Sequence, residues 1–336
     1  MIFILVFSTA FLVAVVLTPI AIRMARRTGA LDQPRGRHSH PNPTPRWGGL
    51  PLFVAFFAAV AVSLIYPRTD PNEISRLLGL FLGSLLLFIV GTYDDHFELN
   101  ATGQLIAQTI AAGIAVASGV LIGLVNNPLG DPFVFDNWLA IAFTLFWIVG
   151  MTNTVNWLDG VDGLAAGVVG IAGVILFLHA FFVQEQYSIA LLALALIGAV
   201  LGFLPFNSSP AKIFMGTAGA LVLGFEMGVL SIIGSARVAF ALLALGIPIL
   251  DVAWQIINRL RAGRSPFSGD RGHLHHRLLD HGMSHRAIVI WYYVLTAFFG
   301  ALTLVLPSSI YKLIALIVIG IGALLVLFKI RGAPPR

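Results

Sequence analysis

The sequence predicts an all-α protein that crosses a membrane several times and forms one domain over residues 1–336. Of the 336 residues, 58% are hydrophobic and only 10% are charged, and the mean hydropathy is +0.93. Soluble globular domains carry a far larger charged fraction, so this composition excludes them. The chain contains no cysteine, which excludes disulfide bonds and thiolate metal sites.

Hydrophobic stretches separated by Gly, Pro and charged residues predict about eleven transmembrane helices. The first stretch has neither a basic start nor a small-residue cleavage site, so we expect it to be a retained helix rather than a signal peptide. Several others are rich in Gly, which suits helices that pack closely in a membrane. The helices are expected near residues 2–23, 48–66, 77–93, 104–122, 138–156, 163–183, 187–206, 218–234, 237–260, 287–306 and 309–329.

Lys and Arg are distributed unequally between the two sides that these helices define. Four lie on one side, namely Arg68, Arg76, Arg237 and Lys312, and the other sixteen lie on the opposite side. The positive-inside rule makes the second side cytoplasmic, with the N-terminus outside and the C-terminus in the cytoplasm. Every polar segment described below is then cytoplasmic, whereas a transporter is expected to place such groups at the membrane midplane.

The most informative polar segment is residues 153–167, where a predicted helix should leave the membrane. It carries two amides and two carboxylates at intervals of three residues: Asn153, Asn156, Asp159 and Asp162. Each interval falls about 60° short of a full helical turn, so the four side chains can face one site only if the helix breaks. Gly160 and Gly163 permit such a break. Acidic groups beside a bilayer are usually functional, although a polar loop between two helices is the alternative.

Two polar segments precede it. Residues 91–98 contain adjacent Asp94 and Asp95, which point to different faces of a helix, so one can face an ion or nucleophile while the other supports it. Residues 31–49 combine Pro and Gly with arginines, whose forked donors suit phosphate or carboxylate. The alternatives are plain helix caps for the acids, and a topology signal or lipid-headgroup contact for the basic loop.

Two more segments follow it. Residues 203–220 contain Lys212, Phe214 and a Gly-x-x-Gly helix start, where backbone amides suit a phosphate and a ring can stack on a base; a Pro-rich connector is the alternative. Residues 258–279 contain three histidines between two arginines: Arg271, His273, His275, His276 and Arg277. The arginines favour an anion such as a diphosphate over a three-histidine metal site.

Three ionisable residues lie inside predicted helices. Glu226 and His179 are expected to be buried and hydrogen-bonded in structural roles. Asp251, closer to the cytoplasmic end of its helix, is compatible with either a structural or a functional role. Gly282 and Ser284 predict the end of one segment and the N-cap of the next helix.

In this order, the segments resemble the polyprenyl-phosphate N-acetylhexosamine-1-phosphate transferases, relatives of the phospho-MurNAc-pentapeptide translocase of peptidoglycan synthesis. The resemblance covers nearly the whole chain, and its His-Leu-His-His-Arg form is closest to the GlcNAc-transferring branch. The matching motifs are Asp32-x-Pro34 with Arg37, His40 and Pro45-Arg46-x-Gly48-Gly49; Asp94-Asp95; Asn156-x-x-Asp159-Gly-x-Asp162-Gly-Leu; Asn207-x-x-Pro210-Ala-Lys212-Ile-Phe214-Met-Gly216; and His273-x-His275-His276-Arg277.

The resemblance implies transfer of N-acetylhexosamine 1-phosphate, in this branch GlcNAc 1-phosphate, from a UDP-sugar to polyprenyl phosphate, with release of UMP. This would be the first step of a cell-envelope glycan pathway such as lipopolysaccharide or teichoic acid synthesis. The resemblance also implies Mg²⁺, with Mn²⁺ as the alternative, a cytoplasmic site in the bacterial plasma membrane, and a homodimer that binds no nucleic acid. The UDP-sugar, the downstream glycan and the lipid length are left open.

The same resemblance assigns roles to residues. The catalytic residues would be Asp94, Asp95, Asp159 and Asp162, and the metal ligands Asp94, Asp95, Asn156 and Asp159. The substrate-binding residues would be Arg37, His40, Asn156, Asn207, Lys212, Phe214, His273, His275, His276 and Arg277. Among these, Asn207 and Phe214 would hold the uridine, Phe214 by stacking.

The sequence departs from the family pattern in two places. The family usually has Met-Gly-Asp-x-Gly-Ser, with that Asp as a magnesium ligand, where this chain has Thr217. A neutral hydroxyl is a poorer Mg²⁺ ligand than a carboxylate. Arg37-His38 also replaces the usual Arg-Lys. Either the remaining acids hold the ion, or the chain is a weak or silent relative that binds lipid phosphate or nucleotide as a regulatory or interaction protein.

Overall fold

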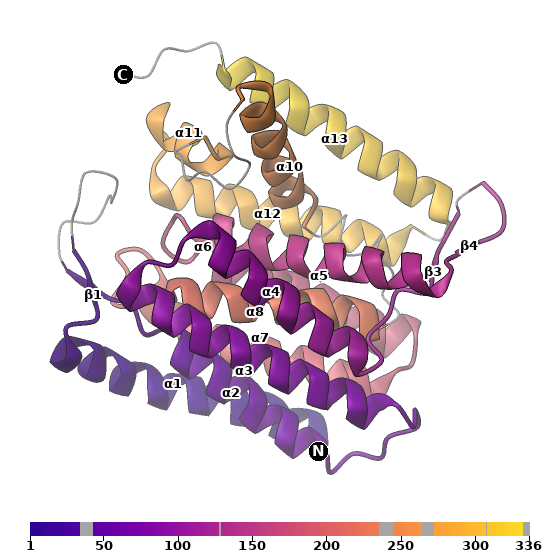
Figure 1. Ribbon diagram of the computed structural model, residues 1–336, viewed down its shortest axis with the longest axis horizontal. Coiled ribbons are helices and arrows are strands. Elements are labelled where there is room, and N and C mark those ends of the chain that lie inside the picture. The colour runs from indigo at the N-terminus through magenta and orange to yellow at the C-terminus, as the bar shows by residue number, and fades with distance from the viewer. Residues whose placement is uncertain (34–42, 128, 235–244, 264–271, 307, 332–336) are drawn as a thin grey trace.

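The computed structural model describes residues 1–33, 43–127, 129–234, 245–263, 272–306 and 308–331 as a bundle of helices (Figure 1). This confirms the predicted all-α class. The strands form two short antiparallel pairs, β1 (Leu31–Asp32) with β2 (Thr44–Pro45) and β3 (Leu124–Val125) with β4 (Phe133–Val134). The helices are α1 (Ile2–Thr28), α2 (Gly49–Ser63), α3 (Glu73–Phe97), α4 (Ala101–Ala117), α5 (Asn137–Leu158), α6 (Leu164–Leu178), the π-helical turn η1 (His179–Val183), α7 (Tyr187–Asn207), α8 (Gly216–Ile233), α10 (Gly246–Arg261), α11 (Leu274–Asp280), α12 (His285–Val305) and α13 (Ser309–Arg331).

Within these described residues, seven helices are long and apolar enough to cross a membrane: α1, α3, α5, α6 together with η1, α7, α8 and α12. The helix α2, the helix α4 and the first part of α13 are apolar but shorter. The chain is therefore a multi-pass membrane protein. The predicted stretches coincide with helices to within a few residues, except that the stretch 237–260 begins outside the described residues and continues in α10. The number of spans and their orientation stay predictions.

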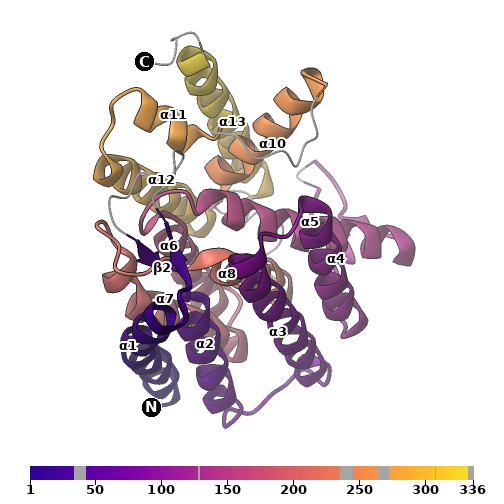
Figure 2. The same ribbon diagram turned by 60° about the vertical axis from the view of Figure 1, so that its left-hand side comes forward.

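The helix α8 lies in the middle of the bundle, and most of its residues are buried (Figure 2). It packs against α3 and α5. A Cβ atom on Gly91 of α3 would lie 2.4 Å from the Cα atom of Ala218, and a Cβ on Gly49 would lie 2.7 Å from the backbone nitrogen of Gly219. Small residues at such contacts let helix backbones approach closely, which improves the van der Waals packing that helps helices associate in lipid. The start of α8 is therefore fixed against α2 and α3.

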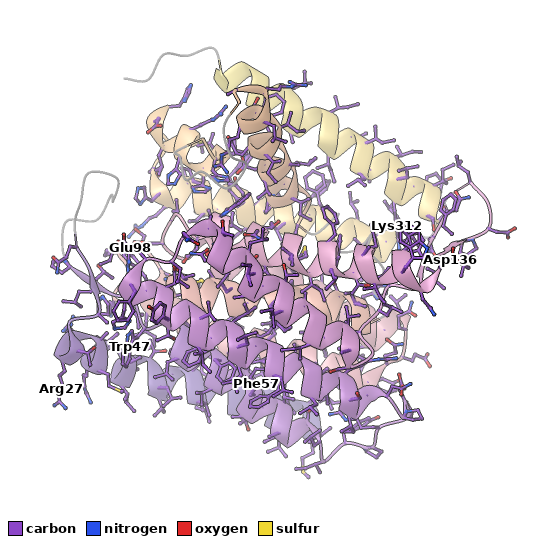
Figure 3. The ribbon with its side chains drawn as sticks, viewed as in Figure 1. Arg27, Trp47, Phe57, Glu98, Asp136 and Lys312 are labelled. Carbon is purple, nitrogen blue, oxygen red and sulfur yellow. The ribbon has the colours of Figure 1, made fainter. Side chains whose placement is uncertain are left out.

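The two ends of the bundle carry different parts of the chain. The strand β1 and the helix α11 lie at one end, and β3 and β4 lie at the other (Figure 1). The side chains of Arg27, Trp47 and Glu98 lie at the first end, and those of Asp136 and Lys312 lie at the second (Figure 3). We call the first end, which also carries the polar segments discussed below, the β1 end.

A cavity of about 200 Å³ lies between the α2–α3 and η1–α7 connections, and none of the predicted site residues lines it. Two of its acidic residues are paired with arginines that lie nearby. Asp70 forms an ion pair with Arg76, and Glu73 forms one with Arg68. The cavity is thus separate from the site that the sequence predicts.

For the ionisable residues predicted inside helices, the structure agrees on burial but differs on the hydrogen bonding of Glu226. Glu226 is fully buried in α8, as predicted, but neither of its carboxylate oxygens has a hydrogen-bond partner in the described part of the chain. The expectation that this side chain is hydrogen-bonded is therefore wrong. His179 is buried at the start of η1.

The predicted N-cap of α12 is confirmed, because the Ser284 hydroxyl oxygen accepts a hydrogen bond from the Ala287 N–H.

Candidate functional site

The break predicted in the Asn/Asp segment lies between α5 and α6. The helix α5 ends at Leu158 and α6 begins at Leu164, so Asp159 and Asp162 stand in the connection. Gly163 ends this connection with φ = +76°, a conformation that favours glycine. Asn153 remains inside α5, where its amide exchanges hydrogen bonds with Gln108 of α4. The break thus frees the two carboxylates from the helix, whereas both amides, Asn153 and Asn156, remain inside α5.

Asp159 lies near two other carboxylates. Burial, then repulsion by Asp95 and by Asp162, raises the pKa of the Asp159 carboxyl to about 7, while Arg46 acts in the opposite direction. Residues from α3, the first loop and the α5–α6 connection are therefore close enough to Asp159 for their charges to act on its carboxyl group. We call Asp95, Asp159 and Asp162 the acidic cluster. A partly buried group of like charges is an environment that a bound cation would stabilise.

The adjacent acids Asp94 and Asp95 have different partners. The Oδ1 atom of Asp95 accepts a hydrogen bond from the Thr217 N–H at 2.8 Å, and its Oδ2 accepts one from the Ala218 N–H at 3.3 Å. A carboxylate at the first turn of α8 also interacts favourably with the helix dipole. Asp94 instead secures the turn after α3, where its Oδ1 accepts from the Gln104 side chain at 2.9 Å. Their different directions agree with the prediction from helical geometry.

The α7–α8 connection joins the acidic cluster through Asp162, whose Oδ2 accepts a hydrogen bond from the Ala211 N–H at 3.0 Å. In the same connection, the Asn207 side chain donates to the Ile213 carbonyl at 3.0 Å. The Oδ1 atom of Asn207 is buried and has no partner in the described part of the chain, so it can accept a hydrogen bond from a ligand. Lys212 is exposed and Phe214 is half-buried.

The first loop is tied to the start of α8. The Phe214 N–H donates to the Pro45 carbonyl at 2.8 Å. Gly216 follows with φ = +68°, and a Cβ atom there would lie 2.5 Å from Asp95 Oδ2 and 2.6 Å from the Arg46 carbonyl oxygen. Glycine is thus required both by the backbone conformation and by the crowding of Arg46 and Asp95 around this point.

The histidines of α11 approach the α5–α6 connection. A Cβ atom on Gly160 would lie 2.4 Å from Nε2 of His275 and 3.2 Å from Nε2 of His276. His275 is almost completely buried, and neither ring nitrogen has a partner among the residues that the structure describes. Burial, with smaller effects of His276 and His273, lowers the pKa of His275 well below its usual value. The ring is therefore neutral at physiological pH and can donate one hydrogen bond and accept another.

His273 is held in place by Asp251 of α10. The Nδ1 atom of His273 lies 3.0 Å from Asp251 Oδ2, and Asp251 Oδ1 accepts a hydrogen bond from the Leu274 N–H at 2.9 Å. The rings of His273 and Trp157 lie 5.6 Å apart, and the Arg259 guanidinium lies 5.4 Å from the Trp157 ring. Asp251, for which the sequence left both kinds of role open, thus supports the histidine segment.

The structure brings predicted residues from several segments together at the β1 end. Asn156 lies partly buried in the last turn of α5, next to the connection, and Arg277 lies partly buried in α11. Arg37 and His40 lie outside the described residues. The predicted residues that meet around the α5–α6 connection are Asp95, Asp159, Asp162, His275 and His276.

Sequence reasoning did not place Arg46 in the site, although Arg46 stands in the Pro45-Arg46-x-Gly48-Gly49 motif. The signal for it was a cation two residues before the paired glycines Gly48 and Gly49 at the start of α2. In the described ranges, no group of three or more His, Asp or Glu side chains is arranged as a ready-made metal site. The metal ligands and roles suggested by the sequence therefore stay predictions.

The sequence is similar to known proteins over most of its length. Residues 77–235 match the profile of glycosyl transferase family 4. The chain is 34% identical over 312 residues to a probable undecaprenyl-phosphate N-acetylglucosaminyl 1-phosphate transferase of Bacillus subtilis, over 90% of this chain and 84% of the relative. It is 33% identical over 343 residues to a decaprenyl-phosphate N-acetylglucosaminephosphotransferase of Mycobacterium tuberculosis, over 92% of this chain and 85% of that protein. It is 30% identical over 308 residues to a phospho-N-acetylmuramoyl-pentapeptide-transferase of Bacillus cytotoxicus, over 85% and 92% of the two chains.

Proposed function

Since the chain belongs to glycosyl transferase family 4, we propose that it transfers N-acetylglucosamine 1-phosphate from a UDP-sugar to a polyprenyl phosphate and releases UMP. The names of the Bacillus subtilis and Mycobacterium tuberculosis relatives contain both the polyprenyl phosphate and the N-acetylglucosamine. The observation that carries the proposal is that the acidic cluster and the histidines meet around Gly160 at one end of a membrane bundle.

In the proposed reaction, an oxygen of the lipid phosphate attacks the β-phosphorus of the UDP-sugar. A new P–O bond forms to the lipid phosphate, and the bond from the β-phosphorus to the oxygen bridging the two phosphates breaks. That oxygen leaves on the α-phosphate as UMP, and the lipid keeps a diphosphate that carries the sugar. Catalysis of this kind depends mainly on positioning and on stabilising negative charge.

The donor set fits a hard divalent cation. Carboxylate and amide oxygens are the ligands that Mg²⁺ prefers, and the repulsion within the acidic cluster would be relieved by it. We propose that Asp95, Asp159 and Asn156 hold Mg²⁺, or Mn²⁺, with Asp94 contributing through the carboxylate oxygen that its hydrogen bond to Gln104 leaves open. Bound there, the ion would offset negative charge on the diphosphate.

The other residues of the site would bind and orient the substrates. His275 and His276 lie against Gly160, where the neutral His275 ring can donate a hydrogen bond to a phosphate oxygen. Arg277 of the same helix would add charge-assisted bonds. The buried Oδ1 of Asn207, which has no partner in the described residues, would accept a hydrogen bond from the uracil base, and Phe214 would stack on that base. Lys212, which is exposed, would meet the nucleotide at the surface.

We place this reaction at the cytoplasmic face of the bacterial plasma membrane, as the first step of a cell-envelope glycan pathway, in a protein that forms a homodimer. The support for the cytoplasmic face is the excess of Lys and Arg on the side that carries the polar segments. The pathway step and the homodimer are proposed from the family resemblance alone.

The proposal predicts metal-dependent release of UMP. Purified protein supplied with UDP-GlcNAc, polyprenyl phosphate and Mg²⁺ should release UMP and form the lipid-linked sugar diphosphate, and EDTA should abolish both until Mg²⁺ is restored. The measurement is UMP by chromatography, with reactions that lack polyprenyl phosphate as the control. Absence of UMP with every UDP-N-acetylhexosamine tested would favour the alternative, a silent relative that binds lipid phosphate or nucleotide.

Thr217 allows a test of the metal position. Its backbone N–H binds Asp95 Oδ1, so a carboxylate at residue 217 would lie beside the acidic cluster at the start of α8. Thr217→Asp should therefore keep or raise the apparent affinity for Mg²⁺, because a carboxylate is a better ligand than a hydroxyl. The check is the Mg²⁺ dependence of UMP release, with Thr217→Asn as the uncharged control of similar size. Loss of all metal-dependent turnover in the Asp variant would contradict the proposed metal position.

A further inference from the structure

Arg46 is the cation of the acidic cluster, but its ion-pair partner lies outside that cluster. Its Nη2 atom donates to Oδ1 of Asp32 at 2.5 Å. Its charge also attracts the carboxylates of Asp95 and Asp159, neither of which forms a hydrogen bond with it. Arg46 is thus held by Asp32 and lies close enough to Asp95 and Asp159 for its charge to act on them, and its carbonyl oxygen and Asp95 Oδ2 both lie against Gly216.

The backbone around Arg46 is fixed by three separate parts of the chain. The Arg46 N–H donates to the Ala30 carbonyl at 3.1 Å, and the preceding Pro45 carbonyl accepts from the Phe214 N–H at 2.8 Å. The Arg46 carbonyl oxygen lies against Gly216, where a Cβ atom would come within 2.6 Å of it. A residue held in this way can present its side chain in one direction at little further cost in entropy.

The Arg46 guanidinium keeps donors that no described residue accepts from. A guanidinium carries several N–H donors in a planar fork, and of these Nη2 donates to Asp32. Nε and Nη1 of Arg46 have no acceptor among the residues that the structure describes, and 27% of the side chain is exposed. Asp32 is itself buried in β1, which fixes the orientation of the fork. Planar arginine forks of this kind are suited to phosphate oxygens.

We propose that Arg46, oriented by Asp32, binds a phosphate group of a substrate next to Asp95 and Asp159. The inference rests on the proposed function for the source of that phosphate. Two sources share the chemistry, namely the monophosphate of the lipid acceptor and the diphosphate of the nucleotide donor. In either case Arg46 reduces the repulsion between the anionic substrate and the acidic cluster, and Asp32 is a positioning residue.

Steady-state kinetics with Mg²⁺ test this, with UDP-GlcNAc and polyprenyl phosphate varied separately. Arg46→Gln should raise KM by about 10- to 100-fold for the substrate whose phosphate it binds, the usual effect of losing a charged hydrogen bond. Arg46→Lys should give a smaller increase, because lysine keeps the charge but not the fork. Asp32→Asn should raise the same KM less than Arg46→Gln. An increase for polyprenyl phosphate identifies the monophosphate, and one for UDP-GlcNAc identifies the diphosphate.

Arg27→Gln is the matched control, since Arg27 is an exposed arginine at the same end of the bundle (Figure 3). It should leave both KM values unchanged. If Arg46→Gln also leaves both unchanged, whatever happens to kcat, the inference fails and the Arg46–Asp32 pair has a structural role only. Should Arg46→Gln not fold, the Arg46→Lys and Asp32→Asn variants answer the same question.

A second measurement does not depend on turnover. Inorganic phosphate and inorganic pyrophosphate, added to the full chain with Mg²⁺ at constant ionic strength, should raise the Tm of the wild type and of Arg27→Gln. The same anions should raise the Tm of Arg46→Gln much less. A wild type that binds these anions through Arg46 but never releases UMP would contradict the proposed function and support this inference. Equal Tm increases in the wild type and in Arg46→Gln would overturn it.

Discussion

Asp159→Asn is expected to lower the rate of UMP release by about 10²- to 10³-fold, the usual effect of removing one group that stabilises charge in a transition state. Asp159 stands at the centre of the acidic cluster, where it interacts with both Asp95 and Asp162. Asparagine keeps the size of the side chain but removes its negative charge, so the proposed metal ion loses a charged ligand. The measurement is UMP release over a range of Mg²⁺ concentrations.

The same substitution should not destabilise the protein without metal. The pKa of Asp159 is raised to about 7 in the folded protein, above its ordinary value of 3.8. Ionisation therefore destabilises the fold at pH values above that ordinary value, and neutral asparagine avoids this cost at neutral pH. The Tm of Asp159→Asn in EDTA should equal or exceed that of the wild type.

Asp131→Asn provides the control for Asp159→Asn, because Asp131 is an exposed acid in the connection between β3 and β4, at the opposite end of the bundle. Its rate and its Tm should match those of the wild type. Near-normal turnover of Asp159→Asn would rule out Asp159 as an essential carboxylate.

Gly216→Ala is expected to abolish most of the activity and to lower the free energy of unfolding by about 1–3 kcal/mol. Alanine would be strained at φ = +68°, and its Cβ atom would lie 2.5 Å from Asp95 Oδ2 and 2.6 Å from the Arg46 carbonyl oxygen. Since one of these contacts is with backbone, relief requires the first loop to move away from α8. The checks are the rate of UMP release and the Tm.

Gly29→Ala separates backbone strain from crowding. Gly29 has φ = +75°, but a Cβ atom there would meet nothing within 4 Å. It should therefore cost about 1 kcal/mol of stability and leave the rate of UMP release unchanged. Wild-type turnover in Gly216→Ala would mean that the contact of Asp95 and Arg46 around Gly216 does not matter for the reaction.

Much of the site could be predicted before the fold was known. The spacing of Asp159 and Asp162 on either side of Gly160 predicted a break after α5, and the break is there. Adjacent positions of Asp94 and Asp95 predicted that they face different ways, and they bind Gln104 and the start of α8, respectively. These features depend on neighbouring residues, so local geometry is enough to predict them.

Other parts could not be predicted because they join residues that are far apart in the chain. Asp95 caps α8 through Thr217, which is 122 residues away, and no local pattern pairs these positions. The bond between Asp251 and His273 and the meeting of the histidines with Gly160 likewise depend on how helices pack. The failure at Glu226 has the same origin, because hydrogen-bond partners for a side chain inside α8 come only from neighbouring helices.

By itself, the sequence determined that this chain is a helical, multi-pass membrane protein and which of its segments carry polar chemistry. Composition and hydrophobic length suffice for this, because a bilayer requires each spanning segment to satisfy its own backbone hydrogen bonds. Only the tertiary structure decided which of the polar side chains meet. Close contacts at Gly91 and Gly160 join α3 to α8 and the α5–α6 connection to α11, and the contact at Gly216 brings Arg46 and Asp95 together.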